Sequence, residues 1–145
     1  MYYPIYIKIK NRKCLIVGAG RVASRKIRTL LDLGAGITVI APEAVDEILK
    51  LQQDDELILH LREYRSPEAA DYDLVISASD NEGINRLVAD DCFKYKIPVN
   101  VVDRPELCSF IVPSIVKRGG ITIAVSTGGR APFLAKQIRK ELDST

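Results

Sequence analysis

Short apolar runs alternate with amphipathic stretches along the first hundred residues. Continuous apolar runs are typical of strands covered on both faces, and apolar residues three or four apart indicate helices. The apolar runs are 13–17, 37–40, 57–61, 74–78 and 98–102, and the amphipathic stretches are 21–32, 44–53 and 81–95. This order predicts a Rossmann-like α/β fold, a doubly wound parallel sheet built from βαβ units.

Helix-capping and helix-ending residues predict where these elements begin and end. Gly34 is expected to end the first helix, and Asn81 is expected to cap the helix that runs to about residue 95. A short segment at 67–70 precedes the fourth strand. Residues 2–10 alternate apolar and polar side chains, which predicts an additional edge strand.

The pattern changes after Asp103. Runs at 110–116 and 121–125 flank Gly119 and Gly120, which predicts a β-hairpin, and Pro132 suits the first turn of a terminal helix. We therefore divide the chain into a Rossmann-like domain at 1–105 and a hairpin and helix at 106–145. The apolar surface of such a hairpin has to pack against another surface. We favour packing against a second subunit over packing against the chain's own sheet.

The first strand leads directly into Gly-x-Gly-x-x-Ala, formed by Gly18, Gly20 and Ala23. Gly18 allows the tight turn, Gly20 lets the backbone approach a pyrophosphate, and Ala23 keeps the helix close to the strand. Phosphates are favoured at the positive end of the helix dipole. The order of strand, turn and helix favours a dinucleotide site over a glycine turn in another α/β layout.

Ligands of open α/β sheets bind beyond the carboxyl ends of the strands, so residues that leave strands are candidates for the site. These candidate stretches are 18–22, 41–43, 77–80 and 100–104. No cation follows the second strand before Lys50, which favours NAD over NADP. Glu43 is the candidate for the acid that binds the ribose. Arg21 is a cation beside the glycine turn, so NADP stays an alternative cofactor.

Asp103 follows the fifth predicted strand, where its carboxylate could accept a proton while hydride leaves a substrate. It could instead only cap the turn before Pro105. Asp80 has the same ambiguity, since it could cap the helix that follows.

Composition describes an ordinary globular chain of 145 residues, with 47% hydrophobic and 28% charged residues. No apolar run approaches the ~20 residues that span a bilayer, so we expect a cytoplasmic protein without membrane contact. Cys14, Cys92 and Cys108 are widely spaced and His60 is the single histidine, which predicts buried thiols, a structural histidine and no protein metal site.

Charge is distributed unevenly. Residues 1–102 carry 14 basic and 15 acidic side chains, whereas 103–145 carry 7 basic and 4 acidic ones. The net charge of +2 is too small to indicate nucleic acid. The basic excess is either a solvated helix face or an anion-receiving rim near Arg104, Lys117, Arg118 and Arg130.

Several motifs together resemble the precorrin-2 dehydrogenase family, which includes the amino-terminal module of siroheme synthase. In order, they are Cys14-Leu-Ile-Val-Gly-Ala-Gly-Arg-Val-Ala, Ala78-Ser-Asp, Asn100-Val-Val-Asp, Ser109-Phe-Ile-Val-Pro-Ser and Ala124-Val-Ser-Thr-Gly-Gly. The most specific feature is Asn-Val-Val-Asp followed at short range by Ser-Phe-Ile-Val-Pro-Ser. The resemblance covers nearly the whole chain, although family members usually continue for several helices beyond it.

The resemblance implies NAD-dependent oxidation of precorrin-2 to sirohydrochlorin in a homodimer, sometimes with insertion of ferrous iron to give siroheme. It implies that Asp103 is the general base. The implied cofactor residues are Gly18, Gly20, Arg21, Val22, Pro42 and Glu43, with Ser79 and Asp80 near them by strand position. For the tetrapyrrole carboxylates, Arg104, Ser126, Thr127 and Arg130 are the candidate partners.

Two other functions stay open. One is a regulatory module that senses NAD without catalysis, although it would not account for the Ser-Phe-Ile-Val-Pro-Ser hairpin. The other is a ferrochelatase that keeps the glycine turn only as scaffold.

Overall fold

The computed structural model describes residues 1–144. Two compact units divide the chain: Ile5–Ser109 form one, and Met1–Pro4 with the described residues from Phe110 onward form the other. None of the helices formed by residues 1–144 has the length and apolar character to cross a membrane.

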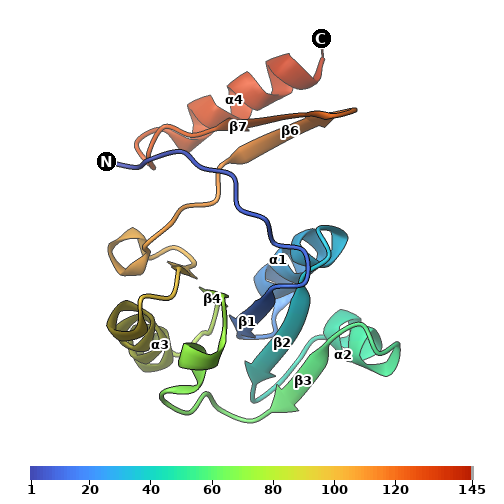
Figure 1. Cartoon of the computed structure of the whole chain (residues 1–145), viewed down its shortest axis with the longest axis vertical. Coiled ribbons are helices and arrows are strands. Elements are labelled where there is room, and N and C mark those ends of the chain that lie inside the picture. The colour runs from blue at the N-terminus through green and yellow to red at the C-terminus, as the bar shows by residue number, and fades with distance from the viewer. Residues whose placement is uncertain (145) are drawn as a thin grey trace. The chain divides into compact units, whose positions relative to one another are not determined.

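The unit Ile5–Ser109 holds a five-stranded parallel sheet in the order β3-β2-β1-β4-β5 (Figure 1). Its strands are β1 (Lys13–Val17), β2 (Gly36–Ala41), β3 (Ile58–Leu61), β4 (Leu74–Ser77) and β5 (Val99–Val101). Its helices are α1 (Arg21–Asp32), α2 (Asp46–Gln53) and α3 (Glu82–Tyr95), with short 3₁₀ turns η1 (Glu68–Asp71) and η2 (Pro105–Leu107). The predicted Rossmann-like α/β class is confirmed.

Both faces of this sheet are covered, as its continuous apolar strands predict. Leu15 and Val17 of β1 belong to a buried cluster with Val88 and Cys92 of α3. Cys14 and Ile16, the alternate residues of β1, are equally buried on the other face of the sheet. Helices α1 and α2 cover that face (Figure 1). The helices cover the faces of the sheet and not the carboxyl ends of its strands, where open α/β folds bind ligands.

The predicted element ends agree closely with the structure. Gly34 has φ +83 just after α1, and the Asn81 side chain accepts a hydrogen bond from the Ile84 amide at 3.2 Å. Helix α2 begins two residues later than its predicted start at residue 44, because Val45 is still extended.

The predicted edge strand at 2–10 is wrong, because these residues form no strand. The alternation there marks no buried face, since Tyr3, Ile5 and Ile7 are 86%, 62% and 54% exposed. A strand also needs a neighbouring backbone for pairing, and alternation alone does not supply one.

The second unit contains the predicted hairpin and helix. Strands β6 (Ser114–Arg118) and β7 (Ile121–Val125) pair antiparallel around Gly119 and Gly120, and α4 (Pro132–Asp143) follows with Pro132 in its first turn. Strand β6 begins later than the predicted residue 110, just after Pro113, which has no amide hydrogen to pair.

The packing inside this second unit follows the strand register. Val116 and Ile123 are opposite each other, and Val116 is buried along with Ala135 of α4. Ile115 and Ala124 form a pair on the opposite face of the hairpin, where both stay exposed.

Candidate functional site

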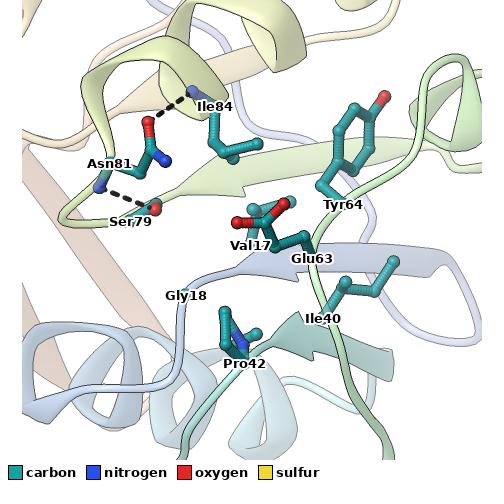
Figure 2. A pocket seen from close by; sticks show the side chains of 10 residues that line it. Val17, Gly18, Ile40, Pro42, Glu63, Tyr64, Ser79, Asn81 and Ile84 are labelled. Atoms are coloured by element: carbon teal, nitrogen blue, oxygen red, sulfur yellow. Dashed lines mark hydrogen bonds between the residues drawn. The ribbon is translucent and has the colours of Figure 1, made fainter.

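A pocket opens at the carboxyl ends of β1, β2 and β4 (Figure 2). About 270 Å³ of space lies in it, counting the part open to solvent. Its walls are formed by Val17, Gly18, Ile40, Ala41, Pro42, Glu63, Tyr64, Ser79, Asn81 and Ile84. A pocket at this edge of a parallel sheet is where open α/β folds bind their ligands.

Gly18 makes the turn out of β1 possible. Its φ is +107, and its amide donates to the Ile40 carbonyl at 2.9 Å. A Cβ at this position would lie 2.4 Å from the Ala78 carbonyl oxygen. Only glycine therefore allows the strand ends of β1 and β4 to approach this closely.

Gly20 leaves the amino terminus of α1 open. It is the N-cap residue, makes no side-chain capping bond, and is followed by no acidic residue in the first turn. A Cβ on Gly20 would meet nothing within 4 Å. Within residues 1–144 the start of α1 thus has no side-chain cap, and the space beside Gly20 is open, which fits the pyrophosphate of a dinucleotide.

Asn85 of α3 holds the chain where it leaves β4. Its Oδ1 accepts hydrogen bonds from the Ser77 hydroxyl at 2.7 Å and from the Ser79 amide at 3.2 Å, and its Nδ2 donates to the Ser79 carbonyl at 2.8 Å. The Ser79 hydroxyl in turn accepts from the Asn81 amide at 3.0 Å (Figure 2). Buried Asn85 therefore fixes the wall of the pocket that Ser79 and Asn81 form.

Glu63 and Tyr64 complete the pocket but are not among the residues predicted from the sequence. Both follow β3, whose carboxyl end lies at the same sheet edge as those of β1 and β2. The rule that selects residues leaving strands applies equally to this strand, so the signal was present in the sequence.

Tyr64 is held in the core by its hydroxyl group. It donates to Asp91 Oδ2 at 2.6 Å and accepts from the Ala69 amide at 3.0 Å, and the Ser66 hydroxyl donates to the other Asp91 oxygen at 2.8 Å. Burial and the bond to Asp91 raise the pKa of Tyr64 well above its usual range. Tyr64 thus acts as a neutral anchor for the wall of the pocket.

The predicted cofactor residues fall into three groups. Gly18, Pro42 and Ser79 line the pocket. Gly20, Arg21 and Val22 form the open start of α1 next to it. Glu43 and Asp80 are exposed and lie outside its lining. Their roles in binding a cofactor stay predictions.

Asp103 follows β5, the strand beside β4, at the same end of the sheet. It is exposed and has φ +62, a left-handed conformation that aspartate tolerates better than most residues. Its role as a base stays a prediction.

Arg104 is engaged by carboxylates of its own chain. Its guanidinium pairs with Glu82 at the start of α3 and with Glu106 at 2.6 Å. The hydrogen bond that Arg104 donates to Glu106 raises the pKa of Arg104 further, so this side chain is always charged. The pairing ties the segment after Asp103 to α3, and a substrate carboxylate would have to compete with two resident ones.

Ser126, Thr127 and Arg130 belong to the other compact unit. The Ser126 hydroxyl accepts from the Gly128 amide at 3.0 Å, and the Thr127 hydroxyl accepts from the Ala131 amide at 2.9 Å. Both hydroxyls keep their hydrogens for other acceptors, and Arg130 is exposed. Their predicted contact with substrate stays a prediction.

The cysteine and histidine side chains lie within residues 1–144, the part that the structure describes. Cys14 and Cys92 are buried, Cys108 is partly buried, and His60 is exposed on β3. Within this described part, no three His, Cys, Asp or Glu side chains come together as a metal site.

A family model described as putative NAD(P)-binding matches residues 5–114, which include the glycine turn and the whole pocket. The chain belongs to this putative NAD(P)-binding family. Residues 118–145 match a second model, described as sirohaem biosynthesis protein central.

Relatives of this NAD(P)-binding chain include siroheme synthases. That of Ruthia magnifica subsp. Calyptogena magnifica is 43% identical over 144 residues, which are 99% of this chain and 30% of the relative. That of Thioalkalivibrio sulfidiphilus is 45% identical over 146 residues, covering 99% of this chain and 29% of the relative. The chain thus spans about 30% of the length of these relatives.

Among solved structures, the fold is similar to one described as SirC, precorrin-2 dehydrogenase. The TM-score is 0.84 at 27% sequence identity, over 99% of this chain and 70% of that one. The resemblance inferred from the motifs is confirmed by these similarities.

Proposed function

We propose that this protein is a precorrin-2 dehydrogenase that forms sirohydrochlorin with NAD as the hydride acceptor. The observation that supports it most is the open, uncapped start of α1 beside the Gly18 turn, in a chain whose fold is similar to a precorrin-2 dehydrogenase. A phosphate-binding helix start and a substrate base at one sheet edge are the parts that such an oxidation requires.

In the proposed reaction, a carbon–hydrogen bond of the macrocycle breaks as its hydride leaves, and a proton leaves the same substrate. Bound NAD supplies the hydride acceptor. The N–H groups at the start of α1 hold its pyrophosphate, and Asp103 accepts the proton on a carboxylate oxygen. The excess of basic residues after 102 suits a substrate that carries several carboxylates.

The proposal includes a homodimer formed through the hairpin and helix. Its support is the apolar surface of these elements, where Phe133 is 80% exposed and Ile121 is 64% exposed. Ferrous iron as a further substrate, a cytoplasmic location and the absence of nucleic-acid and membrane partners stay predictions from the sequence.

Incubation with precorrin-2 and NAD tests the proposal. We expect stoichiometric sirohydrochlorin and NADH, followed by siroheme on adding ferrous iron if the chain also inserts the metal. A folded protein that binds NAD without turnover would instead be a nucleotide-sensing module, and one that inserts iron without NAD affinity would be a ferrochelatase alone.

Asp103→Asn tests the base. Asparagine also tolerates the left-handed backbone at this position but cannot accept the proton. We expect kcat to fall by about 100-fold or more while the Kd for NAD changes by less than about twofold. Asp103→Ala should behave alike, and an equal loss of rate and NAD affinity would deny Asp103 this role.

A further inference from the structure

Glu63 lies between two anchored neighbours. On one side, the Arg62 guanidinium pairs with Glu68, and both side chains are about one quarter exposed, at 28% and 26%. On the other side, Tyr64 is 5% exposed and bonded to Asp91. The backbone of Glu63 is thereby held in place where the chain leaves β3.

The Glu63 side chain extends into the pocket rather than toward a cation. In Figure 2 it reaches across the middle of the pocket, between Pro42 and the turn that carries Ser79 and Asn81. Its carboxylate makes no ion pair with any of residues 1–144. Among the residues that line the pocket, Glu63 alone carries a charge.

A dinucleotide fold that prefers NAD needs a carboxylate near the adenosine ribose. The carboxylate accepts hydrogen bonds from the ribose hydroxyls, and its charge repels the 2′-phosphate of NADP. That acid usually follows the second strand, where this chain has Ala41, Pro42 and Glu43. Pro42 lines the pocket, but Glu43 lies outside its lining.

We propose that Glu63 supplies this carboxylate and makes the pocket selective for NAD over NADP. The inference rests on the proposed function only in requiring a dinucleotide in this pocket, because it does not require turnover. A 2′-phosphate would meet an uncompensated carboxylate there. The adjacent cation, Arg62, already pairs with Glu68 and so is not free to neutralise that phosphate.

Calorimetric titration of the full chain with NAD and NADP measures this selectivity. We expect the wild type to bind NAD at least about tenfold more tightly than NADP. Glu63→Gln keeps the shape and removes the charge, so NADP affinity should rise about tenfold while NAD affinity falls about threefold.

Two matched variants are measured beside Glu63→Gln. Glu56→Gln removes an exposed carboxylate before β3, at the opposite end of the strand from the pocket, and should leave both affinities within about twofold. Glu43→Gln tests the rival acid, and thermal unfolding verifies that each variant folds.

The ratio of the two affinities decides the result. The assignment to Glu63 is overturned if Glu63→Gln leaves the ratio of NAD to NADP affinity unchanged, or if Glu43→Gln changes that ratio more. A wild type that prefers NADP overturns it as well. A folded wild type that binds neither dinucleotide overturns both this inference and the proposed function. Selective NAD binding without oxidation of precorrin-2 rejects only the proposed function, and the Glu63 ratio still stands.

Discussion

Gly18 and Gly20 are two residues apart in one turn but have different surroundings. Gly18 has a positive φ and no room for a Cβ, whereas Gly20 has φ −90 and open space beside it. The first glycine therefore serves the fold, whereas the predicted role of the second is to bind a ligand. Both were predicted from the same motif, and the structure separates their roles.

The pair Gly18→Ala and Gly20→Ala tests this separation. Gly18→Ala should lower the free energy of unfolding by about 3 kcal/mol or more, because the new methyl group would strike the Ala78 backbone. Gly20→Ala should change it by only about 0.5 kcal/mol, yet weaken NAD binding tenfold or more. Denaturant unfolding and NAD titration measure the two effects. Similar stability losses in both variants would contradict the assignment.

Helix α3 positions the pocket wall through a side chain, not only through packing. Asn85 satisfies three polar groups of Ser77 and Ser79 at the end of β4. A helix that packs against a strand can slide, but these directional bonds fix the strand end relative to the helix. The same helix also holds Tyr64 through Asp91.

Replacing Asn85 by Ala should therefore affect stability and binding together. We expect a loss of about 2 to 4 kcal/mol in the free energy of unfolding, since buried groups of Ser77 and Ser79 lose their partners, and a weaker affinity for NAD. Asp90→Asn changes an exposed residue of the same helix and should stay within about 0.5 kcal/mol of the wild type. Chemical denaturation distinguishes the variants, and equal stability of both would refute the bracing role.

For the whole molecule, the division into two units predicts that the sheet unit folds without the hairpin and helix. The core of the sheet unit, including Leu15, Val75 and Val88, lies entirely within Ile5–Ser109. A chain of residues 5–109 should therefore unfold cooperatively and gain thermal stability on adding NAD. Calorimetry with and without NAD checks this. A truncated chain without a cooperative transition would mean that the sheet depends on the hairpin and helix.

Two buried thiols predict how stability depends on pH. Burial raises the pKa of Cys14 to about 11 and that of Cys92 to about 12, from 9.0 for an ordinary thiol. Their stabilising contribution is therefore complete below pH 9 and is lost as pH rises toward the folded-state values. Each thiol should remove about 1 kcal/mol between pH 9 and 10. Unfolding at several pH values in the wild type and Cys92→Ala measures this, and the variant should show the shallower decline.

Local spacing was sufficient to predict the regular elements and the glycine turn. Buried strands, the α1 and α3 helices and the Asn81 cap depend on neighbours a few residues apart, which a sequence displays directly. The same reasoning failed at 2–10, because alternation does not reveal whether a pairing partner exists.

Tertiary structure decided which residues meet at the pocket. Strand β4 pairs with β1, so the chain leaving the edge strand β3 must cross β2 and β1 before it can pair. That crossing brings Glu63 and Tyr64 to the end of β1, more than forty residues from Gly18 in sequence. The position of Glu63 after a strand makes it a candidate, but strand order arises from long-range packing, so the local pattern could not show that its carboxylate enters this pocket.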